Sequence, residues 1–311
     1  MAAIAFPIRL LSSSLRNSSS PLTSVLTRCF SSSEKSAPKP IPSDLCVDVI
    51  SDFNKLPETE QKYLTLESYK LLLATISGLS FPTYQGVTVN KQALVNKLIL
   101  IREKNYNTYV GFSFAHVFEI FFKPSDKSRE NRYITTTYYN GVLSHFRGYD
   151  LGRALMQTLE YSVQNEFPDS NRVSFNITLN PYYYDLRSRL SPLVVPGPRP
   201  VPNSNPEELL KKTMETLGLK ALDPKINPYV ISLESVHPAG VNQQEYLDNA
   251  HKYSIYSQYH MQQTKFRHGL LLCNLSFYNL IENNTLGLPS GKLTNFKPVE
   301  CEVNNYKPKF G

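Results

Sequence analysis

Residues 109–142, YVGFSFAHVFEIFFKPSDKSRENRYITTTYYNGV, decide the fold of this protein. Two segments of this stretch, 109–123 and 132–142, are rich in aromatic and β-branched residues, and Phe112 and Phe114 stand two positions apart. The residues between the two segments are polar and include a proline. This composition and this alternation are typical of β-strands joined by a loop. The stretch therefore predicts two neighbouring strands.

The sequence on both sides of this strand pair has the periodicity of helices and of further strands. Leucines recur at helical spacing in several segments, and Asn205-Pro206-Glu207-Glu208 is a typical helix start. Helices are predicted over 58–76, 90–104, 149–165, 182–190, 205–217 and 242–269, and strands over 173–179 and 229–233. This mixture predicts an α+β fold.

The composition changes along the chain and predicts six regions. A mixed helix and sheet domain is followed by a proline-rich spacer with six prolines and by a smaller, mainly helical C-terminal region. The regions are a transit peptide at 1–33, a proline-rich lead-in at 34–43, the α+β domain at 44–190, the spacer at 191–206, the mainly helical region at 207–286 and an extended tail at 287–311.

The first 33 residues have the composition of a mitochondrial transit peptide. They contain Arg9, Arg16, Arg28 and many serines, and no acidic residue precedes Glu34. A plastid address is the alternative interpretation. Loss of these three arginines lowers the formal net charge from +7 to +4, which does not demand a nucleic-acid partner. We expect a mitochondrial protein in the matrix or on the matrix side of the inner membrane; N-terminal sequencing that finds an intact Met1 in the mature protein would contradict this.

The strongest catalytic and metal-binding motifs do not occur in the sequence. There is no glycine-rich phosphate loop, paired CxxC or HExxH. Cys46, Cys273 and Cys301 are widely spaced, so they predict neither a disulfide framework nor a metal site. The histidines form no recognisable catalytic set. No apolar run reaches the ~20 residues needed to span a bilayer, which leaves peripheral membrane contact open.

One segment resembles a known cofactor-binding loop. Residues 147–155, RGYDLGRAL, follow a predicted strand and open a predicted helix. The segment resembles the acyl-CoA-binding loop of the GNAT acetyltransferase family, with Asp150 in place of the middle glycine. The resemblance implies that Arg147, Gly148 and Gly152 bind acetyl-CoA. It also implies an acyl-CoA-dependent N-acyltransferase of the mitochondrial matrix.

Two tyrosine clusters favour a different function. Tyr138-Tyr139 and Tyr182-Tyr183-Tyr184 lie near arginines in the sequence, a combination that is typical of protein interfaces and less specifically of RNA-binding surfaces. The favoured interpretation is a non-catalytic accessory subunit, without a cofactor, of a respiratory-chain complex, ATP synthase or mitoribosome. Its partners would be other protein subunits, with nucleic acid less favoured. The acyltransferase remains the alternative.

Overall fold

The computed structural model describes residues 39–191, 193–201, 203–233, 236–238, 242–281, 286–288, 291–292 and 301–309. The predicted transit peptide at 1–33 lies outside the described residues. The same holds for residues 34–38 of the predicted lead-in and for residues 289–290, 293–300 and 310–311 of the predicted tail.

Within the described residues the fold is built on a ten-stranded mixed sheet, which confirms the α+β class. Its main order is β11-β10-β6-β5-β4-β3-β1-β12, and β7 and β8 also pair with β10. The pairs β5–β6 and β1–β12 are parallel, and the other pairs are antiparallel. The strands are β1 (Leu45–Ile50), β3 (Val95–Glu103), β4 (Tyr109–Phe122), β5 (Asn131–Val142), β6 (Asn171–Thr178), β7 (Val194–Val195), β8 (Val230–Ser232), β10 (Leu270–Leu280), β11 (Gly291–Lys292) and β12 (Glu302–Asn305); β2 (Ile76–Ser77) and β9 (His237–Pro238) form a separate two-stranded sheet.

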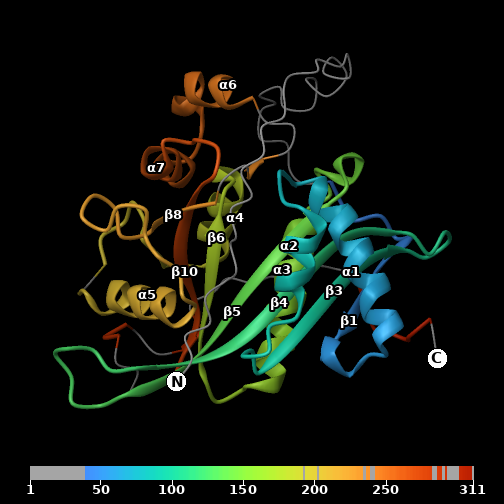
Figure 1. The fold of residues 1–311 in the computed structure, drawn as a ribbon, viewed down its shortest axis with the longest axis horizontal. Helices are drawn as coiled ribbons and strands as arrows, with labels where there is room; N and C mark the ends of the chain where they lie inside the picture. Colours follow the sequence, from blue (N-terminus) through green and yellow to red (C-terminus); the bar gives the residue numbers. More distant parts are fainter. Residues whose placement is uncertain are drawn as a thin grey trace.

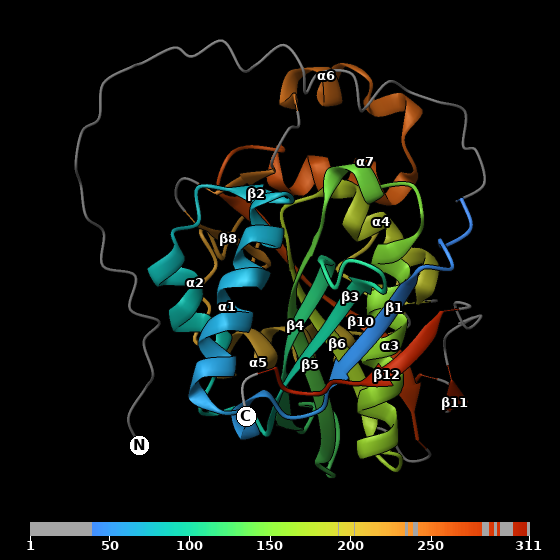
Figure 2. The ribbon, with the colours of Figure 1, turned by 90° about the vertical axis from the view of Figure 1, so that its right-hand side faces the viewer.

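Helices cover both faces of the sheet. Figure 2 shows α1 (Glu58–Leu73) and α2 (Phe81–Thr88) on one side and α3 (Leu151–Glu166) on the other. Phe112 and Phe114 of β4 pack in the core cluster on the α1 side, and Ala115 and Val117 pack in the cluster on the α3 side. The predicted strand pair is thus the centre of the sheet and is buried on both faces.

The helix predicted over residues 90–104 is wrong, because this segment forms β3. β3 lies between β1 and β4, and Leu98, Ile99, Leu100 and Ile101 are all fully buried. A strand that is buried on both faces is a continuous apolar run without alternation. Such a run contains leucines at helical spacing by coincidence. Leu94, which belonged to the expected helical stripe, is 47% exposed.

The C-terminal part contributes both helices and strands. The expected helix at 205–217 is α5 (Asn205–Thr216), and the helix expected over 242–269 is divided into α6 (Gln243–Asp248), a 3-10 turn and α7 (Ile255–Thr264). β10 pairs with β6 along most of its length, so the sheet continues from residues 44–190 into residues 207–286. None of the helices within the described residues has the length and apolar character of a membrane span.

Candidate functional site

The two parallel strands at the centre of the sheet separate from each other. β5 and β6 pair only from Tyr133 and Asn171 to Thr136 and Ser174. Beyond these residues β5 stays paired with β4, and β6 stays paired with β10, so the strands diverge toward the top of Figure 1. We call the region between their separated carboxyl ends the strand fork. Crevices at the carboxyl ends of diverging parallel strands are typical ligand sites in sheets of this kind.

The N-terminus of α3 follows the carboxyl end of β5, where this strand is paired with β4 but not with β6. Gly148 has φ of 91°, Asp150 has φ of 60°, and α3 begins at Leu151. The Asp150 side chain does not cap the helix. The backbone N–H groups of Leu151 and Gly152 have no hydrogen-bond partner in the part of the chain that the structure describes. Free amides and the helix dipole together favour an anion at this end of α3.

The structure separates the three residues that the sequence assigned to cofactor binding. Gly148 and Gly152 both lie at this helix start, and a Cβ on Gly152 would have ordinary contact, 3.7 Å, with the Leu186 side chain. Arg147 instead donates a hydrogen bond to the carbonyl of Ala74 at the end of α1. Two of the three residues are therefore in the turn that presents the free amides, and the arginine binds α1.

The charge of Asp150 is neutralised within the same helical turn. Arg153 forms an ion pair with the Asp150 carboxylate, with 2.5 Å between Nε and Oδ2. Asp150 stands where the family motif has a glycine, and its unpaired charge would repel a phosphate. The ion pair removes most of that repulsion, since opposite charges at this distance cancel at longer range.

Helix α4 (Pro181–Leu190) brings two polar side chains to β5. Asn180 caps the helix by accepting a hydrogen bond from the Tyr182 amide, 2.9 Å. One turn apart on α4, Tyr183 and Arg187 both contact β5. Tyr183 Oη accepts a hydrogen bond of 2.9 Å from Asn140 Nδ2. The Arg187 guanidinium lies 4.9 Å from the centroid of the Tyr138 ring. α4 thus supplies a phenol and a cation to the strand that forms one side of the fork.

These residues were visible in the sequence but were interpreted differently. The tyrosine clusters were expected to face a protein or RNA partner. Tyr139 and Tyr184 instead pack against core clusters. The ring centroids of Tyr138 and Tyr183 are 6.3 Å apart, and these two rings lie between β5 and α4. Arg187 is 0% exposed. Only its spacing of four residues from Tyr183 on a predicted helix could have indicated that the two share a face.

A buried ion pair connects α3 to β6. Glu160 of α3 and Arg172 of β6 are 3.8 Å apart, and each side chain is 4% exposed. Arg172 also donates to the Glu160 carbonyl oxygen, 2.9 Å, and to Gln164, 3.1 Å. Burial raises the pKa of Glu160 to about 7, although the charge of Arg172 acts in the opposite direction. This carboxyl group therefore titrates close to neutral pH.

Replacing Glu160 by glutamine is expected to change the pH dependence of stability. The folded-state pKa of about 7 exceeds the ordinary value of 4.5, so the native carboxyl group binds more protons than the unfolded one between these values. Its contribution to stability therefore decreases as the pH rises from 4.5 to 7, by about 3 kcal/mol in total. Urea unfolding of both proteins across this range should show a decline in wild-type relative to Glu160→Gln.

The comparison of two proteins is necessary because a second buried group has the opposite effect. Burial lowers the pKa of His260 from 6.5 to about 4, so its contribution to stability increases as the pH rises through this range. This histidine is present in both proteins, and its effect cancels in the difference. Parallel stability curves for wild-type and Glu160→Gln would contradict a raised pKa at Glu160.

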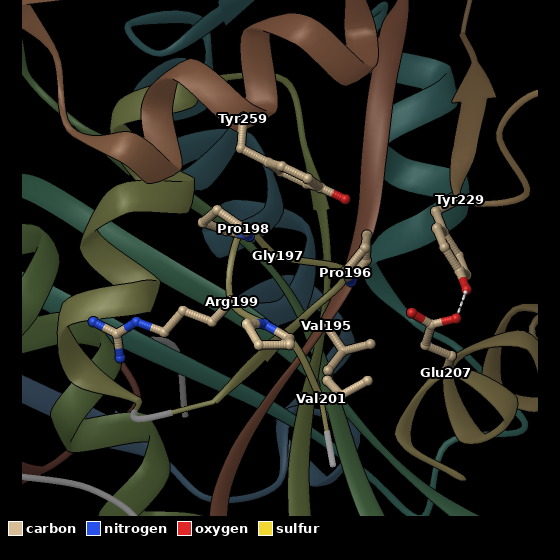
Figure 3. Close-up of a pocket in the computed structure, with 10 residues that line it drawn as sticks. Val195, Pro196, Gly197, Pro198, Arg199, Val201, Glu207, Tyr229 and Tyr259 are labelled. Atoms are coloured by element: carbon tan, nitrogen blue, oxygen red, sulfur yellow. Dashed lines mark hydrogen bonds between the residues drawn. The ribbon is translucent and has the colours of Figure 1, made fainter. Parts of the chain in front are cut away.

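A pocket of about 430 Å³ lies at another place in the sheet (Figure 3). The loop after β7, the start of α5, Tyr229 and Tyr259 line it. Tyr229 donates a 2.8 Å hydrogen bond to Glu207, and Arg199 points away from this pair toward the Tyr256 ring. β7 pairs with β10 on the edge opposite to β6, so this pocket is not part of the strand fork.

Comparisons with known proteins give matches among solved structures only. No protein-family model matches the sequence, and no curated protein matches it. An aminoglycoside acetyltransferase from an uncultured soil metagenomic sample is 13% identical, with 47% of this chain and 86% of that chain covered and a TM-score of 0.28. An aminoglycoside N-acetyltransferase in complex with CoA is 12% identical, with 60% and 93% covered and a TM-score of 0.29. A ribosomal-protein-alanine N-acetyltransferase from Brucella melitensis is 13% identical, with 41% and 76% covered and a TM-score of 0.24.

The expectation of a non-catalytic accessory subunit was wrong. The solved structures named above are acetyltransferases, and none of them is described as a subunit of a respiratory-chain complex, ATP synthase or mitoribosome. The expectation that its partners are other subunits of such a complex was wrong for the same reason. The expectation came from elimination, because the sequence showed no group of residues able to do chemistry. The strand fork contains candidates for such a group: the amides at the start of α3 that have no partner among the described residues, the half-buried Tyr183 phenol and the buried Arg187 guanidinium.

Proposed function

We propose that this protein is an N-acyltransferase that uses an acyl-CoA as acyl donor. The observation that carries the proposal is the strand fork: β5 separates from β6, and the uncapped N-terminus of α3 follows the carboxyl end of β5. In the overall reaction a C–N bond forms, the C–S bond of the thioester breaks, and the proton lost by the amine ends on the CoA thiol. An enzyme for this reaction needs an anion site, a place for the thioester and a proton donor.

The helix start meets the requirements of an anion site for the CoA pyrophosphate. The amides of Leu151 and Gly152 have no hydrogen-bond partner among the described residues, and the absence of a Cβ at Gly148 and Gly152 leaves the backbone accessible. A phosphate binds well to such amides at a helix N-terminus. The ion pair between Asp150 and Arg153 removes the charge that would oppose it. These residues would hold the pyrophosphate of the cofactor.

Tyr183 is the proton donor that the geometry favours. Its hydroxyl oxygen accepts a hydrogen bond from Asn140, so its own proton is directed toward another acceptor. Burial raises the pKa of Tyr183 well above its ordinary value and keeps the phenol protonated at neutral pH. A neutral phenol that faces a developing thiolate can donate its proton as a general acid.

Binding of acetyl-CoA to wild-type and to Gly152→Asp tests the proposal. Wild-type is expected to bind saturably in a calorimetric titration. In Gly152→Asp the affinity should fall at least tenfold, because a carboxylate would lie next to the amides that bind the phosphate. The Cβ has room at this position, and an acidic residue in the first turn stabilises a helix, so the variant should fold.

The matched control introduces the same charge elsewhere. Gly86 lies in α2, and a Cβ there would meet no atom within 4 Å. Gly86→Asp should bind acetyl-CoA with wild-type affinity. Equal affinity of the two aspartate variants for acetyl-CoA would count against the proposed function, and so would a wild-type protein that binds no acyl-CoA saturably.

A further inference from the structure

Arg187 is a buried cation whose charge the described chain does not neutralise. The side chain is 0% exposed, and it forms no ion pair with any described residue. Nη1 donates to the sulfur of Met156, 3.3 Å, and Nε and Nη2 have no hydrogen-bond partner among the described residues. Burial lowers the pKa of Arg187 to about 10, which still leaves it charged at neutral pH. A buried charge without a partner is strongly unfavourable, so its retention requires an explanation.

Aromatic rings satisfy only the faces of the guanidinium. Its carbon lies 4.9 Å from the Tyr138 ring centroid and 5.1 Å from the Tyr278 ring centroid. Such contacts stabilise a cation through the faces of the rings. The N–H bonds lie in the guanidinium plane and need acceptors at its edge. A thioether sulfur is a weak acceptor, so this edge remains a strong donor.

Two acidic residues on the helices around Arg187, Glu160 and Asp185, are engaged with other groups. Glu160 pairs with Arg172. Asp185, on the same helix as Arg187, accepts a hydrogen bond of 2.5 Å from Ser254 and pairs with Arg189 at 3.4 Å. Neither carboxylate is within ion-pair distance of Arg187. The partner of this cation is therefore expected to come from a ligand.

The position of Arg187 indicates which part of a ligand reaches it. Its side chain lies between Met156 of α3 and Tyr138 of β5, beyond the point where β5 and β6 separate. The Tyr138 hydroxyl is also buried without a partner among the described residues. Tyr183 lies one turn away on α4. The start of α3 already offers a site for the CoA pyrophosphate. Arg187 therefore remains to bind the acyl end of the substrate.

We propose that Arg187 binds a carboxylate at the far end of the acyl group, so that the preferred donor is the CoA thioester of a dicarboxylic acid. This rests on the proposed function. A carboxylate is the acceptor that matches the planar edge of a guanidinium, with two parallel hydrogen bonds. A phosphate would match it also, but a phosphate is not part of an acyl group. An acetyl group would leave this donor edge unsatisfied.

Calorimetric titrations with succinyl-CoA and acetyl-CoA, without an amine, test the proposal. Wild-type should bind succinyl-CoA at least tenfold more tightly than acetyl-CoA. In Arg187→Met the ratio of the two affinities should fall to about one. Arg187→Lys should give an intermediate ratio, because lysine keeps the charge and loses the paired geometry. Methionine removes an unpaired buried charge at similar length, so we expect this variant to be no less stable in urea than wild-type.

Each other outcome has a distinct meaning. Equal affinity of wild-type for the two thioesters, with saturable binding of both, would overturn the carboxylate site and leave the proposed function standing. Binding of neither would overturn the proposed function. A site for the carboxylate of an amino-acid acceptor gives a different result: Arg187→Met would raise KM for the amino acid and leave the thioester ratio unchanged, which would also overturn the proposal. If Arg187→Met does not fold, the ratio in Arg187→Lys decides.

Discussion

Gly141→Ala is expected to lower the free energy of unfolding by about 3 kcal/mol, at the upper end of the usual range for overpacking. Gly141 lies in β5 where this strand meets α1. A Cβ at this position would lie 2.4 Å from the carbonyl oxygen of Leu71 and 2.5 Å from Phe112 Cε1. The oxygen belongs to the backbone of α1 and cannot rotate away, so either the helix or the strand must move.

Gly86→Ala is the matched control for this substitution. Gly86 lies in α2, where an added methyl group would meet no atom within 4 Å. Alanine is favoured over glycine inside a helix, so the control should be more stable by about 0.5–1 kcal/mol. Urea unfolding of the three proteins measures both changes. A Gly141→Ala protein with wild-type stability would mean that β5 and α1 are not in such close contact.

This contact also concerns the fork. Gly141 is one residue from Asn140, which binds Tyr183. A shift of β5 away from α1 would move the strand that forms one side of the fork. We therefore expect Gly141→Ala to weaken acetyl-CoA binding more than Gly86→Ala does, even in the fraction of molecules that remains folded.

Tyr183→Phe is expected to lower kcat about 100-fold, which is the lower end of the effect of a general acid. The phenol is the group that we assign to protonate the departing thiolate, and phenylalanine keeps the ring and its contact with Tyr138. KM for the acyl-CoA should change far less than kcat, because the anion site on α3 is unaffected. Steady-state assays of thiol release with an amine acceptor measure both constants.

Two measurements separate a proton donor from a structural residue. Tyr182→Phe, one position away on α4, should retain kcat within about twofold, because its ring packs against Tyr246 and Tyr253 outside the fork. A thioester whose thiol has a low pKa needs less protonation as it leaves, so it should reduce the defect of Tyr183→Phe. A defect of equal size with both thioesters would assign Tyr183 to positioning, and an unchanged kcat would exclude it as the donor.

The sequence by itself was sufficient for the elements that have a local cause. The alternation in 109–123 and 132–142 corresponds to β4 and β5, and the apolar periodicity of 58–76 and 149–165 corresponds to α1 and α3. Such patterns reflect which side of one element faces the core, and that information is present in the element itself. The α+β class and the turn before α3 followed from them.

The local signals failed where burial is determined by distant neighbours. β3 has apolar residues on both faces because β1, β4 and helices on the two sides of the sheet surround it, and nothing within residues 90–104 indicates this. The composition of the tyrosine clusters favoured a binding surface. Whether a tyrosine is exposed depends on the whole fold, so the sequence could not show that several of these rings are packed inside.

The strand fork was decided by the tertiary structure alone. The separation of β5 from β6 depends on β10, which pairs with β6 and comes from residues far along the chain. Arg187 is buried only because α3, α4, β5 and β10 meet around its side chain and exclude water from it. A guanidinium on an exposed helix is solvated by water, whereas the buried Arg187 guanidinium, without an acidic partner among the described residues, is unfavourable unless a ligand supplies one.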